Sequence, residues 1–68
     1  MSIAIERVIV NLRINRKKKT KSQQQVAKKL NISQNAYSKL ELGKTKLNLL
    51  QLIIIGEYLE IDVAELLK

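Results

Sequence analysis

Polar side chains that can form directed hydrogen bonds gather near the middle of the chain. Gln34 and Asn35 each carry a planar amide, which presents an acceptor beside a two-hydrogen donor. This arrangement matches the N6 and N7 edge of adenine in the major groove of DNA, and the ammonium group of Lys39 can donate to guanine O6 or N7 or to a phosphate. The same residue types also occur on solvated helix surfaces. Two interpretations therefore stay open, a solvated face or a base-reading set made of Gln34, Asn35, Ser38 and Lys39.

Two short helices joined by a tight turn would hold these side chains outward. Ser22 and Gln25 have the spacing of a capping box, which predicts the first helix over residues 23–30. Asn31 then predicts a sharp turn, because Asn tolerates a positive φ better than any residue except Gly. The resulting helix-turn-helix core spans residues 23–42.

The second of these helices would carry the polar set. Ser33 is a suitable N-cap and Gly43 a suitable residue beyond the C-terminus, so this helix is expected over residues 34–42. Ala27 is small, which lets two short helices that cross steeply approach each other. The inner side of the pair is expected to consist of Val26, Ala27, Leu30, Ile32, Ala36, Tyr37 and Leu40.

A helix is also favoured at the start of the chain, over residues 3–18. The many β-branched residues within 3–10 leave a short N-terminal strand as an alternative. In the helical interpretation, one stripe faces the core and consists of Ile5, Val8, Leu12 and Asn15. A second apolar stripe consists of Ile3, Val10 and Ile14.

The remaining helix signals lie toward the C-terminus. Asn48 can cap a fourth helix, and Asp62 with Glu65 has the spacing of a capping box before a last short helix over residues 63–67. No sustained alternation of polar and apolar residues appears outside the N-terminus. The predicted fold class is therefore all-α, a single compact five-helix domain over residues 1–68.

The charge is distributed unevenly along the 68 residues, whose net charge is +7. Residues 1–46 contain twelve Lys or Arg and two Glu, whereas residues 47–68 contain one Lys and four acidic residues. Such polarity suggests one face for a polyanion and an end turned away from it.

The composition argues against several classes of protein. There is no Cys and no His, so disulfides and the common zinc sites are excluded and no metal is expected. No apolar run reaches the ~18 residues of a membrane span. The few carboxylates are scattered and lie mostly near expected helix starts, where capping explains them. We expect neither an enzyme nor a membrane protein, and no cofactor or small-molecule ligand.

Residues 16–67 resemble the Cro/C1-type helix-turn-helix family, the phage-repressor-like or xenobiotic-response-element group of DNA-binding proteins. The resemblance is carried by SQQQVAKKL, NISQNAYSKLELGK and LNLLQLIIIGEYLEIDVAELL. It implies a lambda-repressor-like DNA-binding domain with the helix-turn-helix at its second and third helices. The implied partner is double-stranded DNA.

The resemblance also implies roles for single residues. In this family the residues matching Gln34, Asn35 and Lys39 read bases. The segment after the recognition helix runs beside the DNA backbone, and amide groups at helix starts can meet phosphates. The expected backbone contacts are Gln23, Ser33, Lys44, Thr45 and Lys46. A partly exposed and therefore weak structural pair is expected between Arg16 and Glu41.

Surplus apolar residues predict self-association. The core stripe of the fourth helix is expected to be Leu49, Leu52, Ile55, Gly56 and Leu59. Its other apolar residues then point elsewhere and form a candidate dimer surface, Leu50, Ile53 and Ile54. Together with the second stripe of the first helix, they either cover each other or bury a partner. We expect a homodimer that binds a palindromic operator.

The sequence thus favours a sequence-specific DNA-binding regulator, a repressor in the cytoplasm at the nucleoid. An antitoxin or controller of a two-gene module would use the same recognition helix and also bind a protein. A protein-interaction module without DNA is a further alternative, since fold alone does not settle function.

Overall fold

The structure, a computed structural model, describes residues 5–68. This part of the chain contains five α-helices. They are α1 (Ile5–Lys18), α2 (Gln23–Lys29), α3 (Gln34–Glu41), α4 (Leu49–Leu59) and α5 (Val63–Leu66). No strand occurs in residues 5–68, so the all-α prediction is confirmed. The alternative of a strand is wrong for residues 5–10, which are helical, and Ile3 lies outside the described residues.

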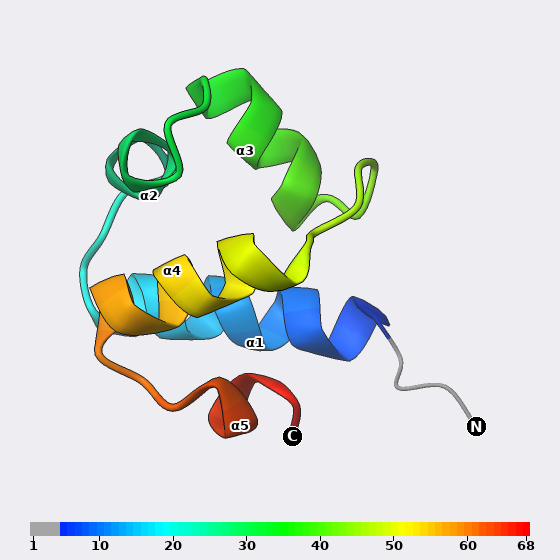
Figure 1. Ribbon diagram of the computed structural model, residues 1–68, viewed down its shortest axis with the longest axis vertical. Helices are drawn as coiled ribbons and strands as arrows, with labels where there is room; N and C mark the ends of the chain where they lie inside the picture. Colours follow the sequence, from blue (N-terminus) through cyan, green and yellow to red (C-terminus); the bar gives the residue numbers. More distant parts are fainter. Residues whose placement is uncertain (1–4) are drawn as a thin grey trace.

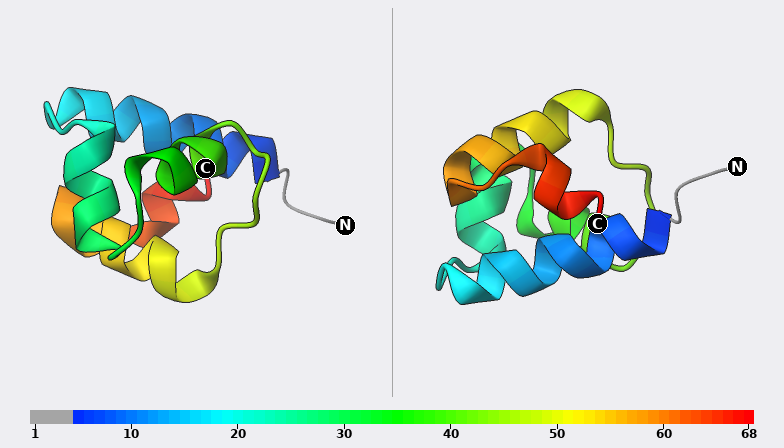
Figure 2. Two further views of the ribbon diagram at one scale, coloured as in Figure 1. Left: turned by 90° about the horizontal axis from the view of Figure 1, so that it is seen from above. Right: turned by 90° about the horizontal axis from the view of Figure 1, so that it is seen from below.

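The helices enclose the core from several sides (Figures 1 and 2). α1 and α4 run along two opposite sides, α3 lies over one open face between them, and α5 lies over the other. α2 closes one end, where it packs against both α3 and α4. Among residues 5–68, only the loop over residues 43–48 spans the opposite end (Figure 2).

The core lies where these helices meet. A buried tyrosine of α3, Tyr37, contributes its ring to an otherwise aliphatic cluster. The helix-turn-helix pair supplies the expected inner side, although Ala36, Ile32 and Leu30 remain half-buried. The largest fully buried apolar side chains are Tyr37, Leu12, Ile55, Leu59, Leu66 and Val26.

The helix starts follow local capping chemistry. Ser22 Oγ accepts from Gln25 N at 3.1 Å and Gln25 Oε1 accepts from Ser22 N at 2.8 Å, so the predicted capping box of α2 is confirmed. A second box, not expected from the sequence, joins Asn48 and Gln51 at the start of α4.

The capping box predicted before α5 is wrong. Asp62 Oδ1 accepts from Ala64 N at 3.1 Å and so caps the helix. Glu65 does not reciprocate, because its carboxylate accepts from Lys68 Nζ at 3.1 Å instead. The hydrogen bond from the Asp62 amide to the Glu65 side chain, which would complete the box, is therefore not formed.

Two residues expected in the core are exposed. Ile5 and Leu49 are the first residues of α1 and α4, and their exposed fractions are 59% and 70%. Both lie at the end of the molecule that α2 does not close (Figure 1). Ile9, which the sequence analysis did not place in the core, is buried. Helical spacing predicts which side of a helix faces the core. It does not predict where along the helix the neighbouring helices end and leave that side exposed.

The turn between α2 and α3 requires a left-handed residue. Asn31 has φ of 60°, as expected, and Gly43 has φ of 74° just beyond the C-terminus of α3. The amide of Ile32, next to Asn31, donates to Ala27 O at 3.0 Å and closes the end of α2. The tight turn between the two helices therefore requires a residue that tolerates a positive φ at position 31.

Replacement of Asn31 tests this dependence. Asn31→Ala should lower the free energy of unfolding by about 1 kcal/mol, because Ala pays more strain at positive φ. Asn31→Gly should leave stability unchanged or raise it, since Gly adopts this conformation freely. Urea unfolding followed by circular dichroism gives both values. Equal stability of the two variants would contradict the assignment.

Candidate nucleic-acid interface

The expected base-reading residues share α3 and differ in exposure. Gln34, Asn35 and Lys39 are exposed, whereas Ser38 is half-buried. Residues three or four apart lie on the same side of a helix, so Asn35, Ser38 and Lys39 form one row. α3 itself lies on the opposite side of the molecule from α5 (Figure 1). The polar row is therefore presented on one outer face.

The expected backbone contacts flank this helix. Lys44, Thr45 and Lys46 are exposed in the loop between α3 and α4. Ser33 Oγ accepts from Ala36 N at 3.0 Å and caps α3, which leaves its hydroxyl hydrogen free to donate. Gln23 begins α2 and is half-buried. Donor groups thus stand on both sides of the polar row.

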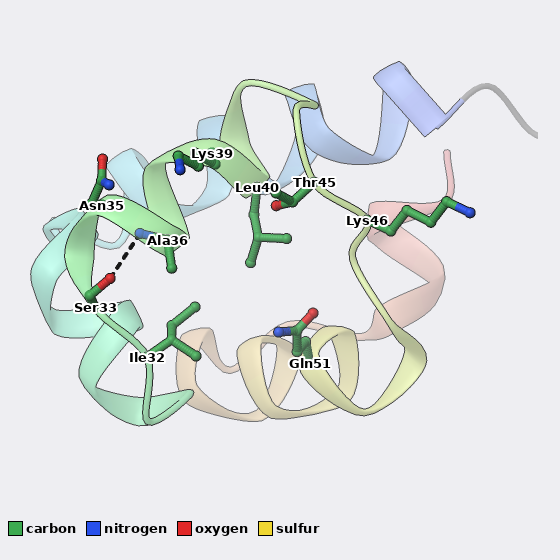
Figure 3. Close-up of a pocket in the computed structure, with 9 residues that line it drawn as sticks. All are labelled: Ile32, Ser33, Asn35, Ala36, Lys39, Leu40, Thr45, Lys46 and Gln51. Carbon is green, nitrogen blue, oxygen red and sulfur yellow. Dashed lines mark hydrogen bonds between the residues drawn. The ribbon is translucent and has the colours of Figure 1, made fainter.

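A hollow of about 460 Å³ lies between α3, the following loop and the start of α4 (Figure 3). Its apolar lining comes from Ile32, Ala36 and Leu40, which point into it. Asn35 and Lys39 stand at its α3 edge, and Gln51 reaches it from α4. Thr45 and Lys46 complete the lining from the loop. α3 thus forms one wall of a hollow that is partly lined by apolar side chains.

A buried carboxylate anchors the other end of α3. Arg16 Nε donates to Glu41 Oε2 at 2.6 Å and Arg16 Nη2 donates to Oε1 at 3.2 Å, so the pair is bidentate. Tyr37 Oη donates to Oε2 at 2.6 Å and Gln23 Nε2 donates to Oε1 at 2.9 Å. Glu41 therefore joins side chains from α1, α2 and α3, and we call these four residues the Glu41 network.

The expected partial exposure of the Arg16–Glu41 pair is wrong. The side chains of Arg16 and Glu41 are only 9% and 2% exposed. Charges this deeply buried are costly unless every lone pair is satisfied. The four hydrogen bonds to the Glu41 carboxylate meet that requirement, and Arg16 Nη1 also donates to Lys21 O at 2.8 Å.

Three members of this arrangement were missed from sequence, and one of them is Gln23, which was expected only as a DNA-backbone contact. Tyr37 was expected only as an apolar core residue, although it lies four residues before Glu41 and so on the same side of α3. Arg13 Nη2 donates to the backbone oxygen of Glu41 at 2.6 Å. Arg13 lies one helical turn before Arg16, and this spacing was the available signal.

The contacts within the Glu41 network shift the pKa values of its ionisable groups. Burial alone would raise the pKa of the Glu41 carboxyl, but the hydrogen bonds from Arg16, Tyr37 and Gln23 outweigh burial and lower that pKa below its usual value. Burial, and then the bond to Glu41, raises the pKa of Tyr37. The bond to Glu41 also raises the pKa of Arg16. At neutral pH the network holds a carboxylate, a guanidinium and a neutral phenol.

A family model described as helix-turn-helix matches residues 12–66, most of the chain. The chain belongs to the Cro/C1-type helix-turn-helix family. This membership identifies it as a DNA-binding domain, and the match includes both α2 and α3. Comparison with curated proteins and with solved structures found no match.

Within residues 5–68, no helix of this helix-turn-helix domain is both long enough and apolar enough to cross a membrane. The same residues contain no group of three or more acidic side chains placed to hold a metal ion.

Removal of one donor tests the Glu41 network. Tyr37→Phe should lower the free energy of unfolding at neutral pH by about 1.5–3 kcal/mol, because it removes a hydrogen bond to a buried charge. The matched control is Tyr58→Phe, in which the ring stays beside Lys21 and Lys29, whose ammonium nitrogens lie 5.1 and 5.2 Å from its centroid. Urea unfolding should show little change for that control. Equal losses in both variants would contradict the role of the Tyr37 hydroxyl.

We also expect the stability difference between wild type and Tyr37→Phe to depend on pH. The folded pKa of Glu41 is lowered, so its stabilising contribution is complete above the unfolded value of about 4.3 and is lost as the pH falls through the folded pKa. The difference in stability between wild type and Tyr37→Phe should therefore narrow as the pH falls below about 4.3. Urea unfolding of both proteins across this pH range measures the difference in stability. A difference that stays constant would show that the hydroxyl does not act through the Glu41 charge.

Proposed function

We propose that this domain is a transcriptional repressor that reads a specific double-stranded DNA sequence with α3. The observation that carries the proposal is that Gln34, Asn35 and Lys39 are exposed on α3, while the far end of the helix is fixed by Glu41. Amides suit adenine and the ammonium group suits guanine or phosphate in the major groove. Ser38 supports the row as a smaller polar contact.

Phosphate contacts on both sides of α3 would set its depth in the groove. Gln23 uses one amide hydrogen on Glu41 and keeps the second for a phosphate. On the other side, Lys44 and Lys46 bring two positive charges, and Ser33 and Thr45 bring hydroxyl donors. Such contacts position the protein on DNA without reading sequence.

The proposed repressor binds as a homodimer. Two recognition helices about one turn of DNA apart would then favour a palindromic operator. The proposal places this activity in the cytoplasm, at the nucleoid.

A second candidate function is supported by the exposed apolar side chains. Val10, Ile14 and Leu42 are about half or more exposed, and others gather at the start of α4. An antitoxin or controller would use such a surface to bind a partner protein while α3 binds DNA. Stable co-purification with the product of a neighbouring gene, together with operator binding, would favour this candidate over a repressor that acts alone.

A selection from random duplexes provides the operator needed to test base reading. Gln34→Ala should weaken binding to the selected site by ~1–3 kcal/mol and relax the preference at one base pair. Lys44→Gln or Lys46→Gln should weaken all sequences alike and flatten the slope of log affinity against log salt by about one. Lys68→Gln, at the far end of the molecule, is the control and should change neither quantity. If Gln34→Ala left both affinity and preference intact, Gln34 would not read a base.

A further inference from the structure

One row of side chains on α1 follows the end of α3. Ile9, Arg13 and Arg16 are spaced by four and three residues, so they lie on the same side of α1, where this helix packs against α3. Arg16 binds the carboxylate of Glu41 within the Glu41 network. Arg13 reaches the backbone of the same residue, since Arg13 Nη2 donates to Glu41 O at 2.6 Å. Two guanidinium groups of α1 therefore meet the last residue of α3.

The third member of the row lies beside the residue just beyond α3. A Cβ atom at Gly43 would lie 3.7 Å from Ile9 Cδ1, which is ordinary van der Waals contact. Ile9, Arg13 and Gly43 also line one small hollow of about 190 Å³, together with Glu41. α1 thus contacts the chain on both sides of the point where α3 ends.

The carbonyl of Glu41 needs a hydrogen-bond donor from outside α3. Lys44 N donates to Lys39 O at 2.9 Å across the left-handed Gly43, which is a common way for a helix to end. The chain has then turned away from the helix axis, and the carbonyls of the last turn lack intrahelical donors. Arg13 supplies a donor to Glu41 O, and its positive charge also favours the C-terminus of a helix. A bond from another helix therefore completes the end of α3.

We propose that Arg13 is a positioning residue for DNA binding, which fixes the end of α3 and the start of the following loop through Glu41 O. This assignment rests on the proposed function, in which α3 reads bases and the loop meets phosphates. Lys44 and Lys46 follow the bonded residue by only three and five positions. A displaced backbone at Glu41 therefore moves both ammonium groups together with the end of α3. Arg13 acts through this backbone and does not itself touch DNA.

Arg13 and Arg16 differ in what their removal leaves behind. Arg16 is buried and pairs with a carboxylate, so its removal leaves an unpaired buried charge and endangers the fold. Arg13 is half-buried and binds a neutral carbonyl, for which water can replace part of the lost bond. A variant at Arg13 should therefore fold, and its DNA binding can be measured in the folded protein.

Binding to two duplexes tests the assignment, the operator selected by wild type and an unrelated sequence of the same length. Arg13→Met removes the donor and should weaken operator binding about tenfold, the effect of one hydrogen bond from a charged group. Binding to the unrelated duplex should fall much less, because contacts to phosphates alone carry no sequence information and tolerate a displaced helix end. Arg13→Lys restores a charged donor and should recover most of the loss. Circular dichroism checks that each variant is folded.

The matched control is Arg7→Met, which removes the same charge from an exposed position of α1. Arg7 lies six residues before Arg13 and therefore on a different side of the helix. The control should keep the ratio of operator to unrelated binding, and both variants should show the same slope of log affinity against log salt. A slope flatter by about one in Arg13→Met alone would overturn the assignment, since the guanidinium would then bind a phosphate directly. A folded Arg13→Met protein with the wild-type ratio would also overturn it, because the bond would then serve stability alone.

A measurement without DNA separates this assignment from the proposed function. Amide hydrogen exchange followed by NMR reports on the backbone bonds of Gly43 and Lys44 at the end of α3. Exchange at both amides should rise about tenfold in Arg13→Met, return toward wild type in Arg13→Lys and stay unchanged in Arg7→Met. Unchanged exchange in Arg13→Met would refute the positioning role, whether or not the domain reads DNA. The expected exchange in a domain that selects no operator would instead refute the proposed function and support the link between Arg13 and the end of α3.

Discussion

The position of α3 depends on one buried carboxylate. Glu41 accepts hydrogen bonds from Arg16, Tyr37 and Gln23, and so holds α3 to both α1 and α2. A charge in that place is favourable only because its bonds replace the water it has lost. Apolar packing alone would leave the helices freer to slide. The directional bonds instead fix the rotation of α3, and this rotation decides which side chains face outward.

The other helices hold the Glu41 network in place. α1, α3, α4 and α5 surround the core. α2 closes one end of it and provides the hydrogen bond from Gln23 to Glu41. Gln23 also stands where a phosphate contact is proposed, and in that proposal one side chain would serve both DNA backbone binding and helix placement. A phosphate that pulls on this amide acts on the same carboxylate that orients α3.

Features set by neighbouring residues could be predicted from the sequence, and features set by distant packing could not. The caps at Ser22 and Ser33 and the left-handed Asn31 follow from side-chain chemistry within a few positions. Glu65 shows the limit, since a competing lysine only three residues away removes its expected role. The burial of the Arg16–Glu41 pair and the exposure of Leu49 depend on where other helices end. The roles of the outward side chains on α3 stay predictions.

The α3 helix separates the groups that hold it from the groups that it displays. Gln34, Asn35 and Lys39 are exposed, whereas Tyr37 and Glu41 bind inward. Substitutions on the displayed side therefore cost the scaffold little. Such a scaffold could acquire preferences for new target sites by exchange of a few surface side chains, while the machinery that keeps it folded stays untouched.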